Sequence, residues 1–147
     1  FSKGVFELTS LHPQFRTQIH NWYDRWEEML GGPLDETVKI LAELKKNQVP
    51  LFILSNWSAE TYPKAEALYD FLQWFDGKII SGEIGKIKPD PEIYKLLIET
   101  YNLSPNNTFF IDDKLANVEA AEDSGIHGIH FQNAATLRED LEKLELL

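Results

Sequence analysis

Short apolar runs alternate along the chain with longer stretches that have helical periodicity. The short runs lie at 51–54, 78–81, 109–111 and 128–131. They are rich in isoleucine, leucine and phenylalanine, which suit a pleated, buried position. A continuous apolar run of this length predicts a strand that is buried on both faces, as in a parallel sheet.

Apolar residues at spacings of three and four predict helices between these strands. The expected helices cover 12–30, 34–47, a stretch from 58, 91–101, 116–123 and a terminal stretch from 137. The first carries one apolar stripe, which predicts a buried face: Phe15, Ile19, Trp22, Trp26 and Met29. Strands that alternate with helices predict an α/β fold with a parallel sheet.

Polar side chains follow two of the predicted strands. Ser55 and Asn56 come directly after 51–54, and Asp112 and Asp113 come directly after 109–111. Ligands of open α/β sheets bind at the carboxyl ends of the strands. Two adjacent carboxylates repel each other unless a cation joins them, and Mg²⁺ prefers such oxygen ligands. The alternative is that the two acids only begin the next helix, where aspartate is a common N-cap.

A third polar feature is Lys88, which ends a glycine-containing loop and precedes Pro89-Asp90-Pro91. A lysine ammonium can bind a phosphate or a carboxylate, and serine and asparagine side chains can hydrogen-bond phosphate oxygens. Combined with the paired acids, these groups predict a phosphoryl-transfer site, where positioning and electrostatic stabilisation supply most of the catalysis. The nucleophile is the part that we do not find.

Composition narrows the class of protein. The 147 residues suit one domain, and a hydrophobic content of 43% is enough for a core. A formal net charge of −10 argues against nucleic acid and anionic membrane partners.

The chain has no cysteine, no apolar run of membrane-spanning length and no signal segment, so we expect a cytoplasmic protein. It begins at Phe1 and its only methionine is Met29, so we expect a trimmed, processed or partial sequence.

Three motifs, in this order, resemble those of the haloacid dehalogenase-like (HAD) hydrolase superfamily, in its 2-haloacid dehalogenase-like branch. They are Leu51–Asn56 for the family's second motif, Lys88–Pro91 for the third and Phe109–Asp113 for the fourth. The resemblance covers residues 31–147, and more loosely the helix before them. The family's first motif, an Asp-x-Asp that supplies the nucleophile and the general acid/base, does not precede Ser55.

The resemblance implies a Rossmann-like parallel sheet flanked by helices. Residues 1–30 would be the remaining end of a helical cap, and 31–147 a core domain that lacks its first strand. In the family that strand lies at the centre of the sheet, here between 51–54 and 109–111.

The resemblance also assigns roles to single residues. Ser55 would bind the phosphate and Asn56 would contact the substrate. Lys88 would neutralise the charges of phosphate and nucleophile. Asp113 would bind Mg²⁺ directly, and Asp112 would hold Lys88 or a metal-bound water, although the two acids could exchange these roles.

The favoured function is a Mg²⁺-dependent phosphatase that hydrolyses a small phosphate ester. The reaction would pass through an aspartyl-phosphate in the intact parent protein. We expect this chain to be inactive alone. One alternative is a 2-haloacid dehalogenase, which needs no metal and has Ser and Asn types in place of the acids Asp112 and Asp113. Another is a non-catalytic binding module.

Two further residues have two possible roles each. Tyr94 is either a feature of the dehalogenase branch or part of the core packing. Asn117 either orients a metal-bound water or makes a local helix contact. The sequence predicts neither the substrate nor the oligomeric state.

Overall fold

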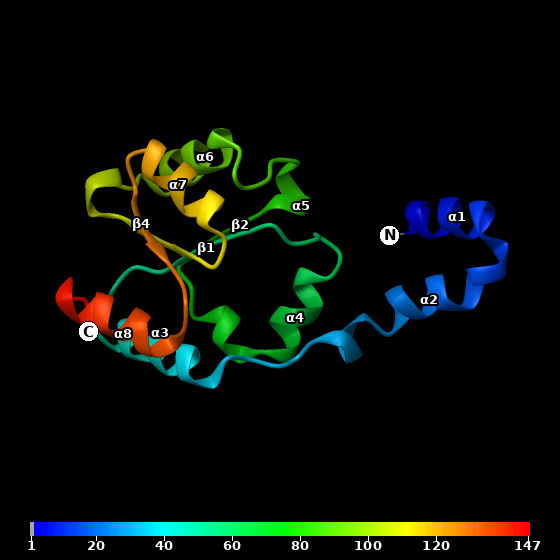
Figure 1. Ribbon diagram of the computed structural model, residues 1–147, viewed down its shortest axis with the longest axis horizontal. Coiled ribbons are helices and arrows are strands. Elements are labelled where there is room, and N and C mark those ends of the chain that lie inside the picture. The colour runs from blue at the N-terminus through cyan, green and yellow to red at the C-terminus, as the bar shows by residue number, and fades with distance from the viewer. Residues whose placement is uncertain (1) are drawn as a thin grey trace.

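The computed structural model describes residues 2–147 and contains the parallel strands that the apolar runs predict (Figure 1). The strands are β1 (Phe52–Ser55), β2 (Gly77–Ile80), β3 (Phe109–Asp112) and β4 (His127–His130). Each begins and ends within one residue of the predicted run. The prediction of an α/β fold with parallel strands is therefore confirmed.

The strands form two separate pairs. β1 pairs in parallel with β2, with Phe52 opposite Gly77, and β3 pairs in parallel with β4, with Phe109 opposite His127. Within residues 2–147, β1 and β3 are not paired with each other. The sheet is thus interrupted between the two strands whose carboxyl ends carry Ser55 and Asp112.

Helices connect and flank the strands. The α-helices are α1 (Ser2–Leu11), α2 (Arg16–Asp24), α3 (Asp35–Lys46), α4 (Tyr62–Leu68), α5 (Ser81–Ile84), α6 (Pro91–Tyr101), α7 (Leu115–Asp123) and α8 (Ala134–Lys143). The 3₁₀ turns are η1 (Pro13–Phe15), η2 (Trp26–Met29), η3 (Asp70–Gln73) and η4 (Pro105–Asn107). None of the helices within residues 2–147 has the length and apolar character needed to cross a bilayer.

Two apolar clusters hold the layers together. Helices α6 and α7 pack on one face of the strands, while α3 and α8 lie on the other (Figure 1). The first cluster is buried between the strands and α6–α7: Leu54, Ile79, Ile93, Tyr94, Leu97, Phe110, Ala121 and Ile126. The second joins α3 to α8: Ile40, Leu44, Leu137 and Leu141. The strand ends are therefore supported from both faces.

The N-terminal region differs from the prediction. The expected helix over 12–30 is divided into η1, α2 and η2, and α1 precedes it where we predicted no helix. Its apolar stripe is not buried, since Phe15, Trp22 and Met29 are 52%, 60% and 47% exposed. The prediction of a buried stripe was wrong, because α1 and α2 extend away from the strands and little of the chain packs on them (Figure 1).

The N-terminal region does reach the rest of the molecule at η2. The Trp26 ring meets the Trp57 ring edge-on, with 6.1 Å between centroids. Beside it, the carboxylate of Glu27 lies 3.6 Å from the ammonium of Lys64. These contacts place the end of the N-terminal region next to the loop that follows β1.

Candidate active site

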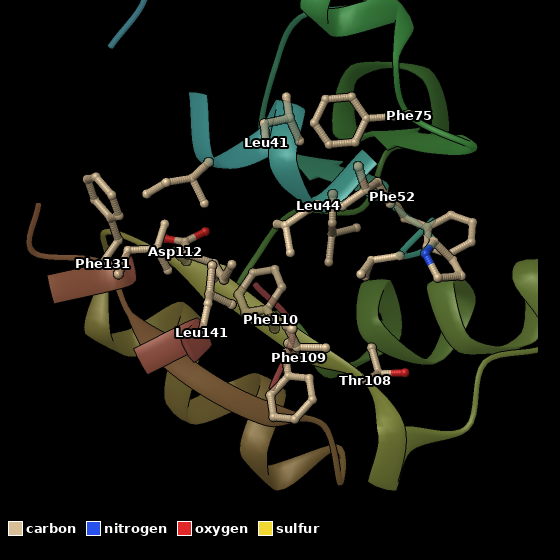
Figure 2. A pocket seen from close by; sticks show the side chains of 18 of the residues that line it. Leu41, Leu44, Phe52, Phe75, Thr108, Phe109, Phe110, Asp112, Phe131 and Leu141 are labelled. Atoms are coloured by element: carbon tan, nitrogen blue, oxygen red, sulfur yellow. The ribbon is translucent and has the colours of Figure 1, made fainter. Parts of the chain in front are cut away.

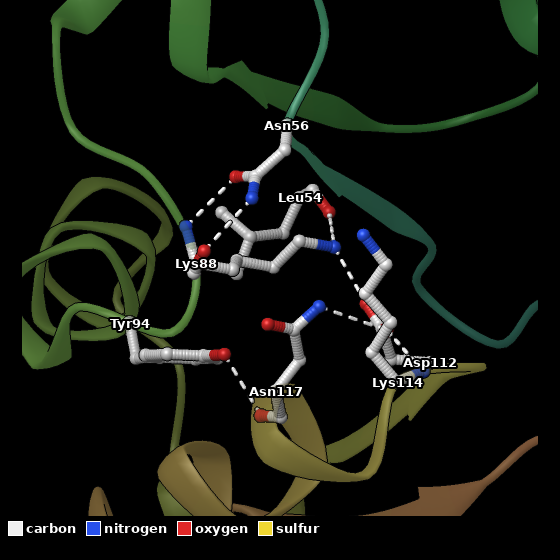
Figure 3. A network of polar contacts seen from close by, with 7 residues as sticks. All are labelled: Leu54, Asn56, Lys88, Tyr94, Asp112, Lys114 and Asn117. Carbon is white, nitrogen blue, oxygen red and sulfur yellow. Dashed lines mark hydrogen bonds and ion pairs between the residues drawn. The ribbon is translucent and has the colours of Figure 1, made fainter.

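A buried ion pair joins the ends of β1 and β3. The ammonium of Lys88 donates one hydrogen bond to the carbonyl oxygen of Leu54, at 2.7 Å, and another to the carboxylate of Asp112, also at 2.7 Å (Figure 3). The two charged side chains are only 9% and 6% exposed. The structure thus brings together Lys88 and Asp112, two candidates that lie 24 residues apart in the chain.

Asp112 is held by donors on both of its oxygens. Oδ2 accepts from Lys88, while Oδ1 accepts from the backbone N–H of Lys114 and from the side-chain amide of Asn117, each at 2.9 Å. Burial raises the pKa of Asp112, but these hydrogen bonds and the charge of Lys88 outweigh burial and hold the pKa below its ordinary value. The carboxylate therefore stays ionised, and its contacts suit the role of orienting Lys88.

Asn56 holds the backbone of Lys88. Its amide nitrogen donates to the Lys88 carbonyl oxygen at 2.8 Å, and its amide oxygen accepts from the Lys88 N–H at 2.7 Å (Figure 3). Both ends of the amide are therefore engaged with one residue. This arrangement fits a positioning role for Asn56, which the sequence did not suggest because the partner lies 32 residues away.

Ser55 and Asp113 border this network of hydrogen bonds. Ser55 is the last residue of β1 and directly follows Leu54, whose carbonyl Lys88 binds. Asp113 follows β3 and its side chain lies at the surface. Its carbonyl oxygen lies 3.0 Å from Nε2 of His130, and Nδ1 of that ring lies 2.9 Å from the amide nitrogen of Gln132. Because Nδ1 must accept from the amide, Nε2 carries the proton and donates to Asp113.

Tyr94 and Asn117 are buried next to the ion pair of Lys88 and Asp112. Tyr94 is fully buried, packs edge-on against Phe110 at 5.4 Å, and donates a hydrogen bond to the carbonyl oxygen of Asn117 at 2.8 Å. Burial raises the pKa of Tyr94 to about 12, so the phenol is neutral. These contacts are core packing, and Asn117 is a direct neighbour of Asp112.

Other polar residues lie outside this network. Lys86 forms an ion pair with Glu92 at the surface. The ring of His127 contacts the carbonyl oxygen of Asn106, 2.9 Å away. Within residues 2–147 there is no group of three or more histidine, cysteine, aspartate or glutamate side chains that could hold a metal ion.

The carboxylates of Asp112 and Asp113 nevertheless fit Mg²⁺ as ligands. This ion keeps several waters and is commonly bound through one or two carboxylates together with substrate phosphate, so it needs no complete protein cage. Asp113 offers an exposed carboxylate next to Asp112, at the open edge of β3.

An apolar cavity of about 850 Å³ lies between β1 and β3 (Figure 2). Phe52 and Leu54 line it from one strand, and Phe110 and Asp112 from the other. Leu44 and Leu141 close it on the side of α3 and α8. The cavity therefore ends beside the ion pair, and the unpaired edges of both strands border it.

A family model described as haloacid dehalogenase-like hydrolase matches residues 8–125. Bifunctional epoxide hydrolase 2 of Mus musculus is 33% identical over 107 residues, which is 71% of this chain and 19% of that protein. Sesquiterpene phosphatase astK of Aspergillus oryzae is 31% identical over 105 residues, which is 71% of this chain and 54% of that protein. The chain thus spans about half or less of the length of these relatives.

A solved structure of an HAD family enzyme is also similar to this chain. An HAD family enzyme of Bacteroides thetaiotaomicron, in complex with magnesium and inorganic phosphate, is similar with a TM-score of 0.57 and 28% identity. The match covers 66% of this chain and 52% of that one.

Proposed function

Because the chain belongs to the haloacid dehalogenase-like hydrolase family, we propose that it forms the phosphate-binding part of a Mg²⁺-dependent phosphatase active site. The observation that carries the proposal is the buried pair of Lys88 and Asp112 at the carboxyl ends of two parallel strands. The substrate is a small phosphate ester. Relatives with phosphatase names and a relative crystallised with magnesium and phosphate support this reading.

Lys88 supplies the positive charge of the site. Asp112 and the Leu54 carbonyl fix its ammonium, and Asn56 fixes its backbone. A cation held in place before the reaction stabilises developing negative charge without having to reorganise. Ser55, next to this ammonium along β1, donates its hydroxyl to a phosphate oxygen.

Asp113 and Asp112 are the residues that would hold Mg²⁺, with Asp113 as the direct ligand. When bound, the ion neutralises phosphate charge and orients the transferring group. Asn117 keeps Asp112 in place through its amide.

The nucleophile belongs to a further strand. In this proposal residues 31–147 are a core domain that takes that strand between β1 and β3, and residues 1–30 are the end of a helical cap. An aspartate at the end of the added strand would form the aspartyl-phosphate, and the chain alone would not turn over. The protein would work in the cytoplasm.

Two measurements test the proposal. In the full-length parent, EDTA and Asp113→Ala should each stop the hydrolysis of p-nitrophenyl phosphate. Lys88→Ala should strongly lower the rate of this hydrolysis. Chloride release from 2-chloropropionate that resists EDTA, without phosphatase activity, would favour the dehalogenase instead. In residues 1–147, inorganic phosphate with Mg²⁺ should bind more weakly after Ser55→Ala, whereas Ser10→Ala in α1 serves as a matched control far from β1.

A further inference from the structure

The carboxylate of Asp113 is exposed, so its direction depends on the backbone that carries it. Its neighbour Asp112 is buried. There, Oδ2 accepts from Lys88, and Oδ1 accepts from Lys114 and Asn117 (Figure 3). Of the two acids, Asp113 is therefore the one that presents its carboxylate to an incoming ligand. The groups that fix its backbone decide where this carboxylate lies.

Both peptide groups that flank Asp113 are held in place. The first ends β3, and its carbonyl oxygen, that of Asp112, accepts a hydrogen bond of 2.9 Å from the N–H of Phe131. The second, between Asp113 and Lys114, is held at both ends. Its carbonyl oxygen lies 3.0 Å from Nε2 of His130, and its N–H donates to Oδ1 of Asp112 at 2.9 Å. A peptide group is planar, so fixing these two groups fixes both backbone dihedral angles of the residue between them.

His130 is the side chain that holds the second peptide group, and β4 places it there. It is the last residue of β4 and lies opposite Asp112 in the parallel register. Its Nδ1 lies 2.9 Å from the amide nitrogen of the Gln132 side chain, and an amide nitrogen can only donate. The neutral ring therefore carries its proton on Nε2, which faces the carbonyl oxygen of Asp113. Gln132 thus selects the tautomer in which His130 donates.

We propose that His130 is a positioning residue for the metal site: its hydrogen bond fixes the backbone of Asp113 and thereby aims the Asp113 carboxylate at Mg²⁺. This inference rests on the proposed function, because it concerns the ion that Asp113 would hold. Mg²⁺ demands nearly octahedral ligand geometry, so a small turn of one ligand weakens its binding. Losing an outer partner that orients a metal ligand costs about tenfold to a hundredfold in metal affinity. Because His130 is exposed and water competes for the carbonyl oxygen, we expect the lower end of this range.

The test replaces His130 in the full-length parent. His130→Phe keeps a planar ring without a donor, whereas His130→Gln keeps an N–H donor at a similar reach. Binding of Mg²⁺ alone is measured by isothermal titration calorimetry, and the Mg²⁺ dependence of p-nitrophenyl phosphate hydrolysis is measured beside it. We expect His130→Phe to raise the Kd of Mg²⁺ and the half-saturating Mg²⁺ concentration about tenfold, and His130→Gln to stay within about threefold of the parent.

A separation of metal affinity from turnover distinguishes this role from a merely structural one. At saturating Mg²⁺, His130→Phe should recover most of its kcat and keep the KM of the parent, because the bonds that hold Lys88 are intact. His127→Phe is the matched control. His127 begins the same strand, is also exposed, and its ring likewise contacts a backbone carbonyl oxygen, that of Asn106, at 2.9 Å. Because it lies at the opposite end of β4, its replacement should leave the Kd of Mg²⁺ unchanged.

Several outcomes would overturn the inference. One is a Kd of Mg²⁺ in His130→Phe within about threefold of the parent. Others are an equal loss of affinity in His127→Phe or His130→Gln, and a loss of kcat that saturating Mg²⁺ does not restore. Failure of the proposed function gives a different result, since the parent itself would then bind no Mg²⁺ and its activity would not respond to EDTA, which overturns both.

Discussion

Replacing Lys88 with methionine tests the ion pair at the centre of the site. Methionine has a similar length and no charge, so it fills the same space without holding the carboxylate. The Asp112 side chain, only 6% exposed, would keep its two bonds to Lys114 and Asn117 but lose its cation. The variant therefore leaves a buried negative charge without a counter-charge.

The size of the effect follows from burial. Removing one partner of a buried ion pair costs about 3–5 kcal/mol of unfolding free energy, and the two remaining hydrogen bonds place Lys88→Met near 3 kcal/mol. Lys39→Met is the matched control, because the pair of Lys39 with Glu36 is 65% and 71% exposed. Solvent screens such surface pairs, so Lys39→Met should change the free energy of unfolding far less than Lys88→Met does.

The destabilisation should depend on pH. In the parent chain the pKa of Asp112 lies below its ordinary value, so its contribution to stability is present above the unfolded pKa and is lost as pH falls through the folded pKa. Without Lys88, burial still raises the pKa of Asp112 while the hydrogen bond and the charge that lower it most directly are gone, so the folded pKa is higher than in the parent chain. The variant therefore loses less stability than the parent chain as pH falls and Asp112 takes up a proton. The gap between the two proteins should therefore narrow from neutral towards acidic pH.

Urea unfolding followed by tryptophan fluorescence at neutral and at acidic pH measures this gap. The double variant Lys88→Met/Asp112→Asn should recover part of the loss at neutral pH, since the buried charge is gone. A loss that is the same at both pH values, and that the second substitution does not reduce, would show that lost packing rather than an unpaired charge is the cause.

Two further predictions concern Gly82 and the buried tyrosines. Gly82→Ala should cost about 1–3 kcal/mol in urea unfolding, because its Cβ would lie 2.4 Å from the backbone nitrogen of Ala59; Gly31→Ala, with nothing within 4 Å, should change little. Burial raises the pKa of both Tyr62 and Tyr94 to about 12. Their contribution to stability is complete below the unfolded pKa of about 10 and is lost as pH rises towards 12. The tyrosinate absorbance of these two residues, found by difference from the Tyr62→Phe and Tyr94→Phe variants, should therefore appear together with unfolding. Tyrosinate of Tyr62 or Tyr94 that forms well before unfolding would contradict this.

The strands and core helices could be predicted because their signals are local. Short runs rich in isoleucine, leucine and phenylalanine predict buried strands wherever they occur, and each of the four strands begins and ends within one residue of its predicted run. The start of α6 is equally local, since Asp90 caps the helix by accepting from the N–H of Glu92 at 2.9 Å and Pro91 occupies its first turn. The helix expected from Ser58 begins only at Tyr62, where Pro63 follows.

The N-terminal stripe could not be predicted correctly, because burial is a property of the partner as well as of the helix. The periodicity of Phe15, Trp22 and Met29 shows that these residues share a face. It does not show that anything covers that face. Only the end of the stripe meets the rest of the described chain, where Trp26 contacts Trp57.

The residue types of the candidate site could be predicted, but the hydrogen bonds between these residues could not. The sequence places acids and a lysine near the ends of strands, and the family resemblance, which the match over residues 8–125 confirms, pairs them. The bonds of Asn56 to the Lys88 backbone and of His130 to Asp113 depend on how loops far apart in the chain come together. Neither has a motif that a single sequence displays.

The separation of β1 and β3 follows from contacts at two places. Closing the sheet would move the pairs together by about 4.8 Å, one strand spacing. At the carboxyl ends, Lys88 extends between Leu54 and Asp112, and its buried charge would have to leave this position. Across the other face, α3, which precedes β1, packs on α8, which follows β4, and Arg138 of α8 binds Glu43 of α3 with two hydrogen bonds of 2.6 and 2.9 Å. Because each of these contacts joins one strand pair to the other, closing the cavity would lose buried packing and an ion pair in exchange for one strand ladder. These contacts therefore oppose the closure of the space between the two strand pairs.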